Sequence, residues 1–230
     1  MEITILYYSA CAENVEFEQR IRDNILKHCG DIPIVSVTQK PIDFGRNICV
    51  GERKNMYINQ FIQMLIGLRE INTKYTLIAE ADFLYPPEYF QFVPQEGLAY
   101  RYHDVYIMYC LDMTKRAVYY LKQFSDGAQM VDTQFFRGRL EDKLGRLCVN
   151  GVWHWDVVPT TDRGHGSYLI HRNQYQVWTG NPTVSFKTGD GVAKYTALKR
   201  RNGYAVRCLE LPYWGNAHEL REKMFKKGEL

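Results

Sequence analysis

The chain has 230 residues, of which 46% are hydrophobic and 24% are charged. This size and composition predict one globular domain with a sizeable core, and they exclude a long disordered segment. The formal net charge of +3 is too small to indicate nucleic-acid binding by itself.

The first 90 residues alternate between apolar, β-branched runs and stretches with helical spacing. In the first helical stretch, Val15, Ile21 and Ile25 form the predicted apolar stripe, and Gly30 ends the helix. Strands that alternate with helices form a mostly parallel sheet with helices on both faces, so we expect an α/β fold. The predicted elements are a strand over 2–8, a helix over 14–28, a strand over 32–38, a helix over 55–71 and a strand over 75–79.

The second half of the chain is less regular. Residues 150–192 are dense in Gly, Trp, His and Asn, which favours loops and short strands. No linker, repeat or low-complexity tract interrupts the sequence, so we expect a single domain over 1–230. The other predicted elements are one or two strands over 98–110, a short helix over 114–124, a helix over 134–148 and a C-terminal helix over 216–226, capped near Asn216.

The six cysteines include no Cys-x-x-Cys pair, and no histidine lies at zinc-finger spacing, so a structural zinc site is not expected. The N-terminus lacks a secretory leader pattern, and no apolar run approaches the ~18 residues of a membrane span. We therefore expect a cytoplasmic protein with reduced thiols. The sequence does not indicate an oligomeric state.

Two carboxylates follow the third predicted strand. Glu80 and Asp82 are separated by one residue, which places both side chains on one face of the loop. Ligands of parallel sheets bind beyond the carboxyl ends of strands, and Ser9 would open on the same edge. Carboxylates in this position suit a transferase that uses a nucleotide-diphosphate sugar, because such an enzyme needs a hard divalent cation to bridge the two phosphates. For that function we assign Asp82 to the metal, and Glu80 to the metal, to one of its waters or to a ribose hydroxyl. A solvated turn is the competing interpretation.

Five segments together resemble a known family: Ile3–Ser9, Ile34–Val37 with Gln39-Lys40-Pro41, Asn55–Gly67, Ala79–Pro86 and Pro212–Ala217. The family comprises small glycosyltransferase-like proteins found mainly in phages and in bacterial or metagenomic sequences. The resemblance extends over most of the chain and is strongest over 2–90 and near 182–220. The family's acidic run is often Glu-Asp-Asp, so Ala81 departs from it while the two outer carboxylates are kept.

The resemblance implies a GT-A (Rossmann-like) fold, a nucleotide-sugar donor such as a UDP-sugar, and Mn²⁺ or Mg²⁺ as cofactor. Within the domain, we assign 1–95 to a nucleotide-binding half and 96–230 to an acceptor-side half. Some phage relatives are associated with sugar addition to hydroxymethylated pyrimidines in DNA, so such DNA is one candidate acceptor, in the host cytoplasm if the chain is phage-encoded. Glycan, lipid-linked and protein acceptors stay open. An extruded base could be held by Trp153, Trp155 and Trp178, with burial in the core as the alternative.

GT-A enzymes hold the nucleotide in the loop after the first strand. Ser9 permits a close approach there, and Tyr8 is positioned to stack on a base. Arg53 and Asn55 precede the second helix and are further candidates for nucleotide contacts, with an exposed helix start as the alternative.

A late loop with the pattern Lys-Thr-Gly-x-Gly presents an ammonium, a hydroxyl and free backbone N–H groups to an anion. In GT-A enzymes such a loop commonly closes over the diphosphate. We therefore assign Lys187, Thr188 and Lys194 to the phosphates. The spacing is not that of a P-loop, and an exposed hairpin turn is the alternative.

An inverting transferase needs a general base near the acceptor hydroxyl. Asp156 and Asp162 are candidates because aromatic residues flank this region. Glu141 and Asp142 in a predicted helix could also supply the base, with a solvated helix surface as the alternative. His165 or His171 could complete the metal shell, as a late histidine does in many GT-A enzymes. The structural alternatives are an aspartate that caps a turn and a histidine that is bonded to backbone.

Two other classes of function compete with glycosyl transfer. A nucleotidyltransferase usually has a Gly-rich loop with Arg or Lys after the first strand, and residues 8–14 lack one. A non-catalytic nucleic-acid-binding module is disfavoured by the balanced charge and by the lack of a recognisable reader motif.

Overall fold

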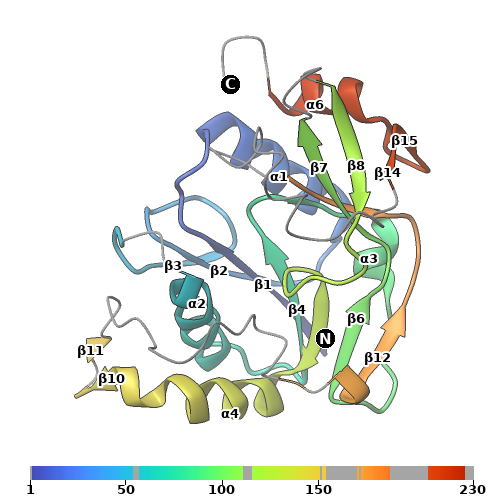
Figure 1. The fold of residues 1–230 in the computed structure, drawn as a ribbon. Helices are drawn as coiled ribbons and strands as arrows, with labels where there is room; N and C mark the ends of the chain where they lie inside the picture. Colours follow the sequence, from blue (N-terminus) through green and yellow to red (C-terminus); the bar gives the residue numbers. More distant parts are fainter. Residues whose placement is uncertain are drawn as a thin grey trace.

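A computed structural model describes residues 2–53, 57–110, 116–150, 152–153, 170, 172–186 and 207–225. They form an α/β fold around a seven-stranded sheet with the strand order β12-β6-β9-β4-β1-β2-β3 (Figure 1). The strands of this sheet are β1 Ile3–Ser9, β2 Ile34–Thr38, β3 Arg46–Cys49, β4 Tyr75–Glu80, β6 Ala99–Tyr102, β9 Gln129–Asp132 and β12 Tyr175–Trp178.

Most neighbouring strands in this sheet are parallel, as the alternation of strands and helices predicts. β1 pairs in parallel with β2 and β4, β2 with β3, and β12 with β6. β9 is the exception, because it is antiparallel to both β4 and β6. The carboxyl ends of β1, β2 and β4 therefore share one edge with the start of β9, and this edge carries the candidate site.

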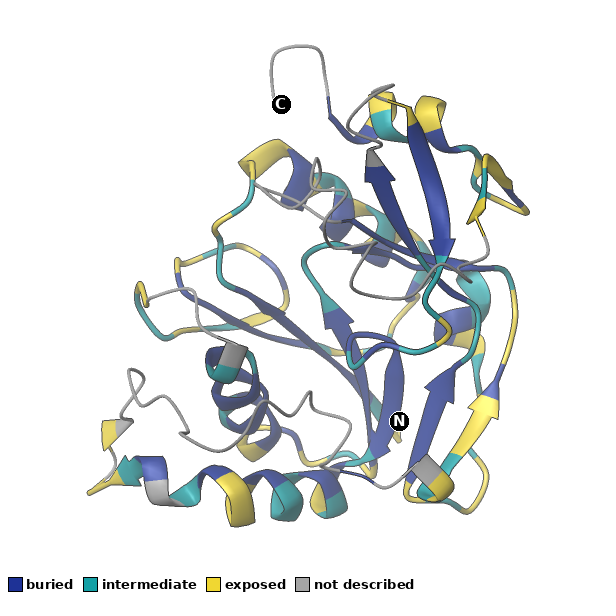
Figure 2. Cartoon of the chain, viewed as in Figure 1, coloured by how far each residue is buried: buried dark blue, intermediate teal, exposed yellow. Residues whose placement is uncertain are grey.

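The alternating side chains of β1 explain why helices cover both faces of the sheet. Tyr7 packs in the same hydrophobic cluster as Phe17 of α1, whereas Leu6 packs in the cluster that contains Leu65 of α2 and Leu140 of α4. The predicted α/β fold with helices on both faces is confirmed, and the central strands are buried (Figure 2). The helices are α1 Val15–His28, α2 Tyr57–Arg69, α3 Pro87–Gln91, α4 Thr133–Leu144 and α6 Ala217–Met224, with 3-10 turns at Gly145–Leu147 and Arg172–Gln174.

A second sheet has the strand order β14-β8-β7-β13-β5. Its strand β5 begins directly after Asp82, so the two sheets meet at the acidic turn. α6 begins after Asn216, whose side chain accepts a hydrogen bond from the backbone N–H of His218, as the predicted cap requires. The strands are β5 Phe83–Leu84, β7 Val105–Cys110, β8 Ala117–Leu121, β13 Thr183–Phe186 and β14 Arg207–Cys208; two small hairpins pair β10 Cys148–Val149 with β11 Val152–Trp153, and β15 Glu210–Leu211 with β16 Gly215–Asn216.

The short helix predicted over 114–124 is wrong, because the described part of this segment contains the strand β8. Residues Ala117–Leu121 read Ala-Val-Tyr-Tyr-Leu, a β-branched and aromatic run that fits a pleated surface better than a helix. β8 pairs antiparallel with β7 along its whole length, and its first four residues are buried. Strands β3 and β9 were not predicted, because each has only four residues and a weak apolar pattern.

The exposure of Val15 and the burial of Trp178 bear on two of the predictions. Val15 does not join the apolar stripe of α1, because it is the first residue of the helix and is 77% exposed. Trp178 is buried and stacks on Phe92 with ring centroids 4.6 Å apart, which favours the core alternative over a role in holding a base. Within the described residues, no helix has the length and apolar character needed to span a bilayer.

Candidate functional site

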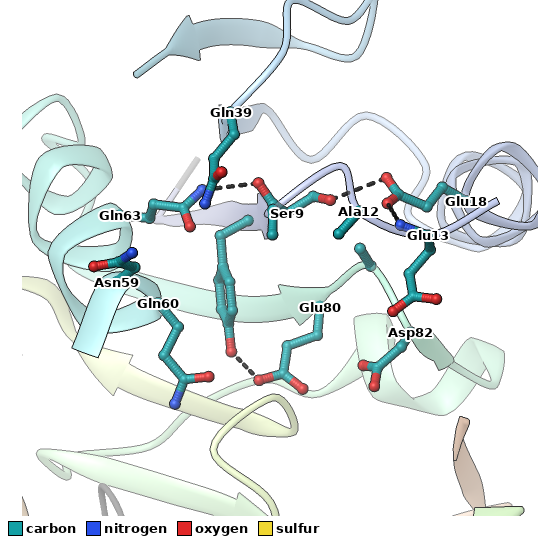
Figure 3. Close-up of a pocket in the computed structure, with 13 residues that line it drawn as sticks. Ser9, Ala12, Glu13, Glu18, Gln39, Asn59, Gln60, Gln63, Glu80 and Asp82 are labelled. Carbon is teal, nitrogen blue, oxygen red and sulfur yellow. Dashed lines mark hydrogen bonds between the residues drawn. The ribbon is translucent and has the colours of Figure 1, made fainter. Parts of the chain in front are cut away.

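A cavity of about 390 Å³ lies where β1 and β4 end (Figure 3). Its volume falls in the range of about 300–1,000 Å³ that is usual for small-molecule and cofactor sites. Its position follows the rule that ligands of parallel sheets bind beyond the carboxyl ends of strands. The lining residues are Tyr8, Ser9, Ala10, Ala12, Glu13, Glu18, Gln39, Asn59, Gln60, Gln63, Glu80, Ala81 and Asp82.

Glu80 and Asp82 reach the cavity from the end of β4. The strand ends at Glu80, and a turn through Ala81 and Asp82 leads into β5. The Glu80 carboxylate accepts a hydrogen bond from the Tyr8 hydroxyl. The backbone carbonyl of Asp82 accepts one from the Phe186 N–H at 2.8 Å. Both carboxylates face the same part of the cavity, so the sheet brings together the two residues that the motif singled out (Figure 3).

Ser9 is buried at the end of β1 and shapes the loop that follows. Its hydroxyl donates to Oε2 of Glu18 at 3.0 Å and accepts a hydrogen bond from the Cys11 N–H at 2.8 Å. Cys11 adopts φ 50°, a left-handed conformation that makes the turn tight. The Ser9 carbonyl accepts a hydrogen bond from the Gln63 amide at 2.9 Å. The loop is therefore tied to α1 on one side and to α2 on the other.

Glu18 is a buried carboxylate that sequence reasoning missed. It accepts hydrogen bonds from the Ser9 hydroxyl and from the Glu13 N–H at 3.4 Å, and it lies 3.6 Å from the Arg22 guanidinium. Burial raises the pKa of the Glu18 carboxyl, and the Ser9 hydrogen bond opposes this shift. A signal was present in the sequence, because Glu18 and Arg22 form an i, i+4 pair beside the buried Phe17.

A row of amide side chains lines the cavity from α2. Asn59 and Gln63 are buried one helical turn apart, and Gln60 beside them is half-buried. The Gln63 amide donates to the carbonyls of Ser9 and Val37, at 2.9 and 2.8 Å, and so joins the ends of β1 and β2. Sequence reasoning saw only the apolar face of this helix. The i, i+4 spacing of two amides on that face was the available signal.

Tyr8 and Arg53, both predicted to contact the nucleotide, have different surroundings. Tyr8 lines the cavity, but it is only 6% exposed and its hydroxyl bonds to Glu80. Burial, followed by the charge of Glu80, raises the pKa of Tyr8 well above its usual value. Arg53 is exposed; its backbone N–H donates to Gln39 Oε1 and its guanidinium to the Val50 carbonyl, both at 2.8 Å. Base stacking by Tyr8 and nucleotide binding by Arg53 stay predictions.

Six of the assigned residues lie outside the described part of the chain, and their roles stay predictions. Phe186 is the last described residue before the loop with Lys187, Thr188 and Lys194, and its N–H donates to the Asp82 carbonyl. Outside the described ranges lie Asp156, Asp162, His165, Lys187, Thr188 and Lys194, together with the alternatives Asn55 and His171.

The described lining of the cavity is acidic. It contains the carboxylates of Glu13, Glu18, Glu80 and Asp82 and no Lys or Arg side chain. Glu13 extends toward Asp82 (Figure 3). Within the described ranges, no three His, Cys, Asp or Glu side chains are grouped as a metal cage. Mg²⁺ commonly takes only one or two carboxylates and completes its shell with waters and substrate phosphates, and Mn²⁺ accepts the same oxygen ligands. The lining therefore fits a cation that binds together with a diphosphate.

No protein-family model and no curated protein matches the sequence. Among solved structures, the chain is similar to the mannosyltransferase PcManGT from Pyrobaculum calidifontis, solved in complex with GDP-Man and Mn²⁺. The two share 13% identity over 89% of this chain and 66% of that chain, with a TM-score of 0.49.

Two further solved structures show a similar level of likeness to this chain. The inositol-1-phosphate CTP transferase from T. maritima shares 11% identity over 86% of this chain and 94% of that chain, with a TM-score of 0.49. The bifunctional IspDF from Campylobacter jejuni shares 12% identity, with a TM-score of 0.43, over 78% of this chain and 49% of its own length. This chain therefore matches about half of IspDF. Similarities at this level do not identify the activity of this chain.

Proposed function

We propose that the chain is a glycosyltransferase that moves a sugar from a nucleotide-diphosphate sugar to an acceptor hydroxyl with the aid of Mn²⁺ or Mg²⁺. The observation that carries this proposal is the pair Glu80 and Asp82. Glu80 ends the central strand β4, Asp82 lies in the turn that follows, and both line a cavity of about 390 Å³. An acidic lining disfavours a free diphosphate. A divalent cation between carboxylates and phosphates reverses that preference.

In this proposal the first half of the chain holds the donor. Asp82 binds the metal, and Glu80 binds the metal, one of its waters or a ribose hydroxyl. When bound, the cation would stabilise the charge that develops on the departing diphosphate. Tyr8 and Ser9 lie at the same edge and are assigned to the nucleoside, with Arg53 as an outer contact.

The chemical step is a displacement at the anomeric carbon of the donor sugar. The acceptor oxygen forms a bond to this carbon, the bond from the carbon to the diphosphate oxygen breaks, and the acceptor proton passes to a general base. Asp156 or Asp162 is assigned as that base. The remaining assignments are Lys187, Thr188 and Lys194 to the phosphates and His165 to the metal shell.

We assign residues 1–95 to donor binding and 96–230 to the acceptor side of one domain. The first acceptor to test is hydroxymethylated pyrimidine in DNA, on the strength of the resemblance to phage proteins. Its exocyclic hydroxyl is the kind of nucleophile that the displacement requires.

The test is a transfer assay with a panel of UDP-, GDP-, CDP- and ADP-sugars, Mn²⁺, and duplex DNA with or without 5-hydroxymethylcytosine. We expect release of a nucleoside diphosphate and a gain of one sugar mass on the modified nucleoside, both abolished by a chelator. Transfer to a different acceptor would refute only the choice of DNA. Pyrophosphate release from a nucleoside triphosphate and a sugar phosphate, without any sugar transfer, would replace the proposal with nucleotidyl transfer.

A further inference from the structure

Glu80 is contacted by residues from three separate parts of the sequence. Tyr8 is the next-to-last residue of β1, and its hydroxyl donates a hydrogen bond to the Glu80 carboxylate. Tyr85 lies just beyond the acidic turn, and Gly127 comes from the second half of the chain, before β9. Tyr85 belongs to the segment Ala79–Pro86 and contacts the Glu80 backbone, whereas Gly127 lies outside every predicted motif and contacts the Glu80 side chain.

The Tyr85 hydroxyl links the end of β4 to the turn before β9, beyond the point where direct pairing between the two strands stops. The ladder runs from Tyr75 to Leu77 on β4. Beyond it, the Tyr85 hydroxyl accepts a hydrogen bond from the Glu80 N–H at 2.9 Å and donates one to the Gly127 carbonyl at 2.6 Å. Tyr85 is fully buried, and its hydroxyl serves as acceptor and donor in the same bridge.

Gly127 lies directly against the Glu80 carboxylate. A Cβ atom built on Gly127 would come within 2.5 Å of Oε2 and 2.7 Å of Cγ of Glu80. Real Cβ atoms do not approach other atoms this closely, so any larger residue would displace the carboxylate or the turn. The absence of a side chain at this position therefore leaves the space that the Glu80 carboxylate fills.

The turn that contains Gly127 is anchored on both sides. The Ala128 N–H donates to the Ser125 carbonyl at 3.1 Å, and the Ala128 carbonyl accepts the Tyr102 N–H at 3.0 Å. The Ser125 hydroxyl accepts a hydrogen bond from the Lys122 ammonium at 2.7 Å. A turn held in this way presents a fixed surface to Glu80.

We propose that Tyr8, Tyr85 and Gly127 are positioning residues that fix Glu80, Tyr85 at its backbone and the other two at its carboxylate, for the metal–diphosphate complex of the donor. This inference rests on the proposed function, because it assumes that Glu80 meets that complex. It adds that the second half of the chain controls donor binding through Gly127. A carboxylate that is fixed before binding loses less conformational entropy when the ligand arrives.

The test compares Gly127→Ala and Tyr8→Phe with the wild-type chain. The probes are UDP, GDP, CDP and ADP, titrated calorimetrically with saturating Mn²⁺ and again with chelator. We expect each variant to weaken the Mn²⁺-dependent affinity for the preferred diphosphate by about 10–100-fold, the usual effect of losing a partner that orients a metal ligand. Affinity in chelator should change far less, which a general loss of structure would not produce.

Two control variants match the two substitutions. Gly138→Ala adds the same methyl group on α4, where a Cβ would meet no described atom within 4 Å. Tyr119→Phe removes a buried hydroxyl that has no hydrogen-bond partner among the described residues. Both controls should bind the Mn²⁺–diphosphate complex like the wild type.

A double-mutant cycle separates contact with Glu80 from general damage. Glu80→Asp shortens the side chain and makes room for the added methyl, so the effect of Gly127→Ala should be smaller in the Glu80→Asp background. Normal metal-dependent binding by both Gly127→Ala and Tyr8→Phe, with loss of binding in Asp82→Asn, would overturn this inference and leave the proposed function intact. If the wild type binds none of the four diphosphates with Mn²⁺, the proposed function fails, and this inference fails with it.

Discussion

Gln63→Leu tests whether the frame of the cavity depends on one buried amide. Gln63 is 2% exposed, and its side-chain N–H groups donate to the carbonyls of Ser9 and Val37 at 2.9 and 2.8 Å. Leucine has a similar volume and cannot donate, so the substitution isolates the two hydrogen bonds from packing. The Ser9 carbonyl keeps a second hydrogen bond, from the Gln39 N–H at 3.2 Å, and Val37 stays paired with Tyr8 in the β1–β2 ladder, so the cost is that of the two lost hydrogen bonds.

Each lost hydrogen bond costs about 0.5–1.5 kcal/mol. Because the leucine side chain recovers part of this by apolar burial, we expect Gln63→Leu to lower the free energy of unfolding by about 1–2 kcal/mol. For a chain of this size, that corresponds to a fall in Tm of roughly 2–8 °C.

The assay is chemical denaturation with two independent probes, supported by scanning calorimetry. Gln60→Leu is the matched control, because Gln60 lies on the same helix, lines the same cavity and is only half-buried. The control should stay within about 0.5 kcal/mol of the wild type. A change of less than about 0.5 kcal/mol in Gln63→Leu would refute the idea that this amide holds the ends of β1 and β2 together.

Three further predictions concern the site and its supports. Asp82→Asn should lower Mn²⁺-dependent affinity for a nucleoside diphosphate by more than about 100-fold, because a direct metal ligand contributes more than the partners that orient it; calorimetry checks this, and an unchanged Tm shows that the fold is intact. Gly67→Ala should destabilise the fold by about 1–3 kcal/mol, because a Cβ there would overlap Leu6, whereas Gly138→Ala should be neutral or stabilising; thermal unfolding of both variants decides. Burial raises the pKa of Glu18, so the folded chain binds this proton more tightly than the unfolded chain does. The stability of the wild type relative to Glu18→Gln should therefore be highest below pH 4.5 and fall as pH rises through the raised pKa, and denaturation at several pH values would expose the opposite trend.

The first half of the fold was predictable because its signals are local. The apolar run of β1, the helical spacing of α1 with its Asn14 cap, and Gly30 at φ 57° each determine an element without help from distant residues. The order of strands and helices then implies a parallel sheet. From that sheet, the shared edge of Ser9 with the acidic turn follows directly.

The errors arise where pairing partners decide the structure. Ala117–Leu121 lies beside Lys and Gln residues that favour helices, and its pairing with β7 and β14 places it in the second sheet. β9 lies between β4 and β6 and is antiparallel to both. No local pattern in its four residues predicts this position.

The site shows the same division between local and distant signals. Glu80 and Asp82 could be found from their spacing after an apolar strand. Glu18 could have been found as a charge beside a buried helix stripe. Gly127 could not, because its requirement for no side chain comes from Glu80, which is remote in the sequence.

The most direct test of the central claim is calorimetric titration of the chain with UDP, GDP, CDP and ADP, with Mn²⁺ and with chelator. The account predicts that one diphosphate binds with an affinity that depends on the metal and disappears in Asp82→Asn. That result would also name the nucleotide of the donor. Absence of binding for all four diphosphates in the presence of Mn²⁺ would contradict the assignment of the acidic edge to a nucleotide-sugar donor.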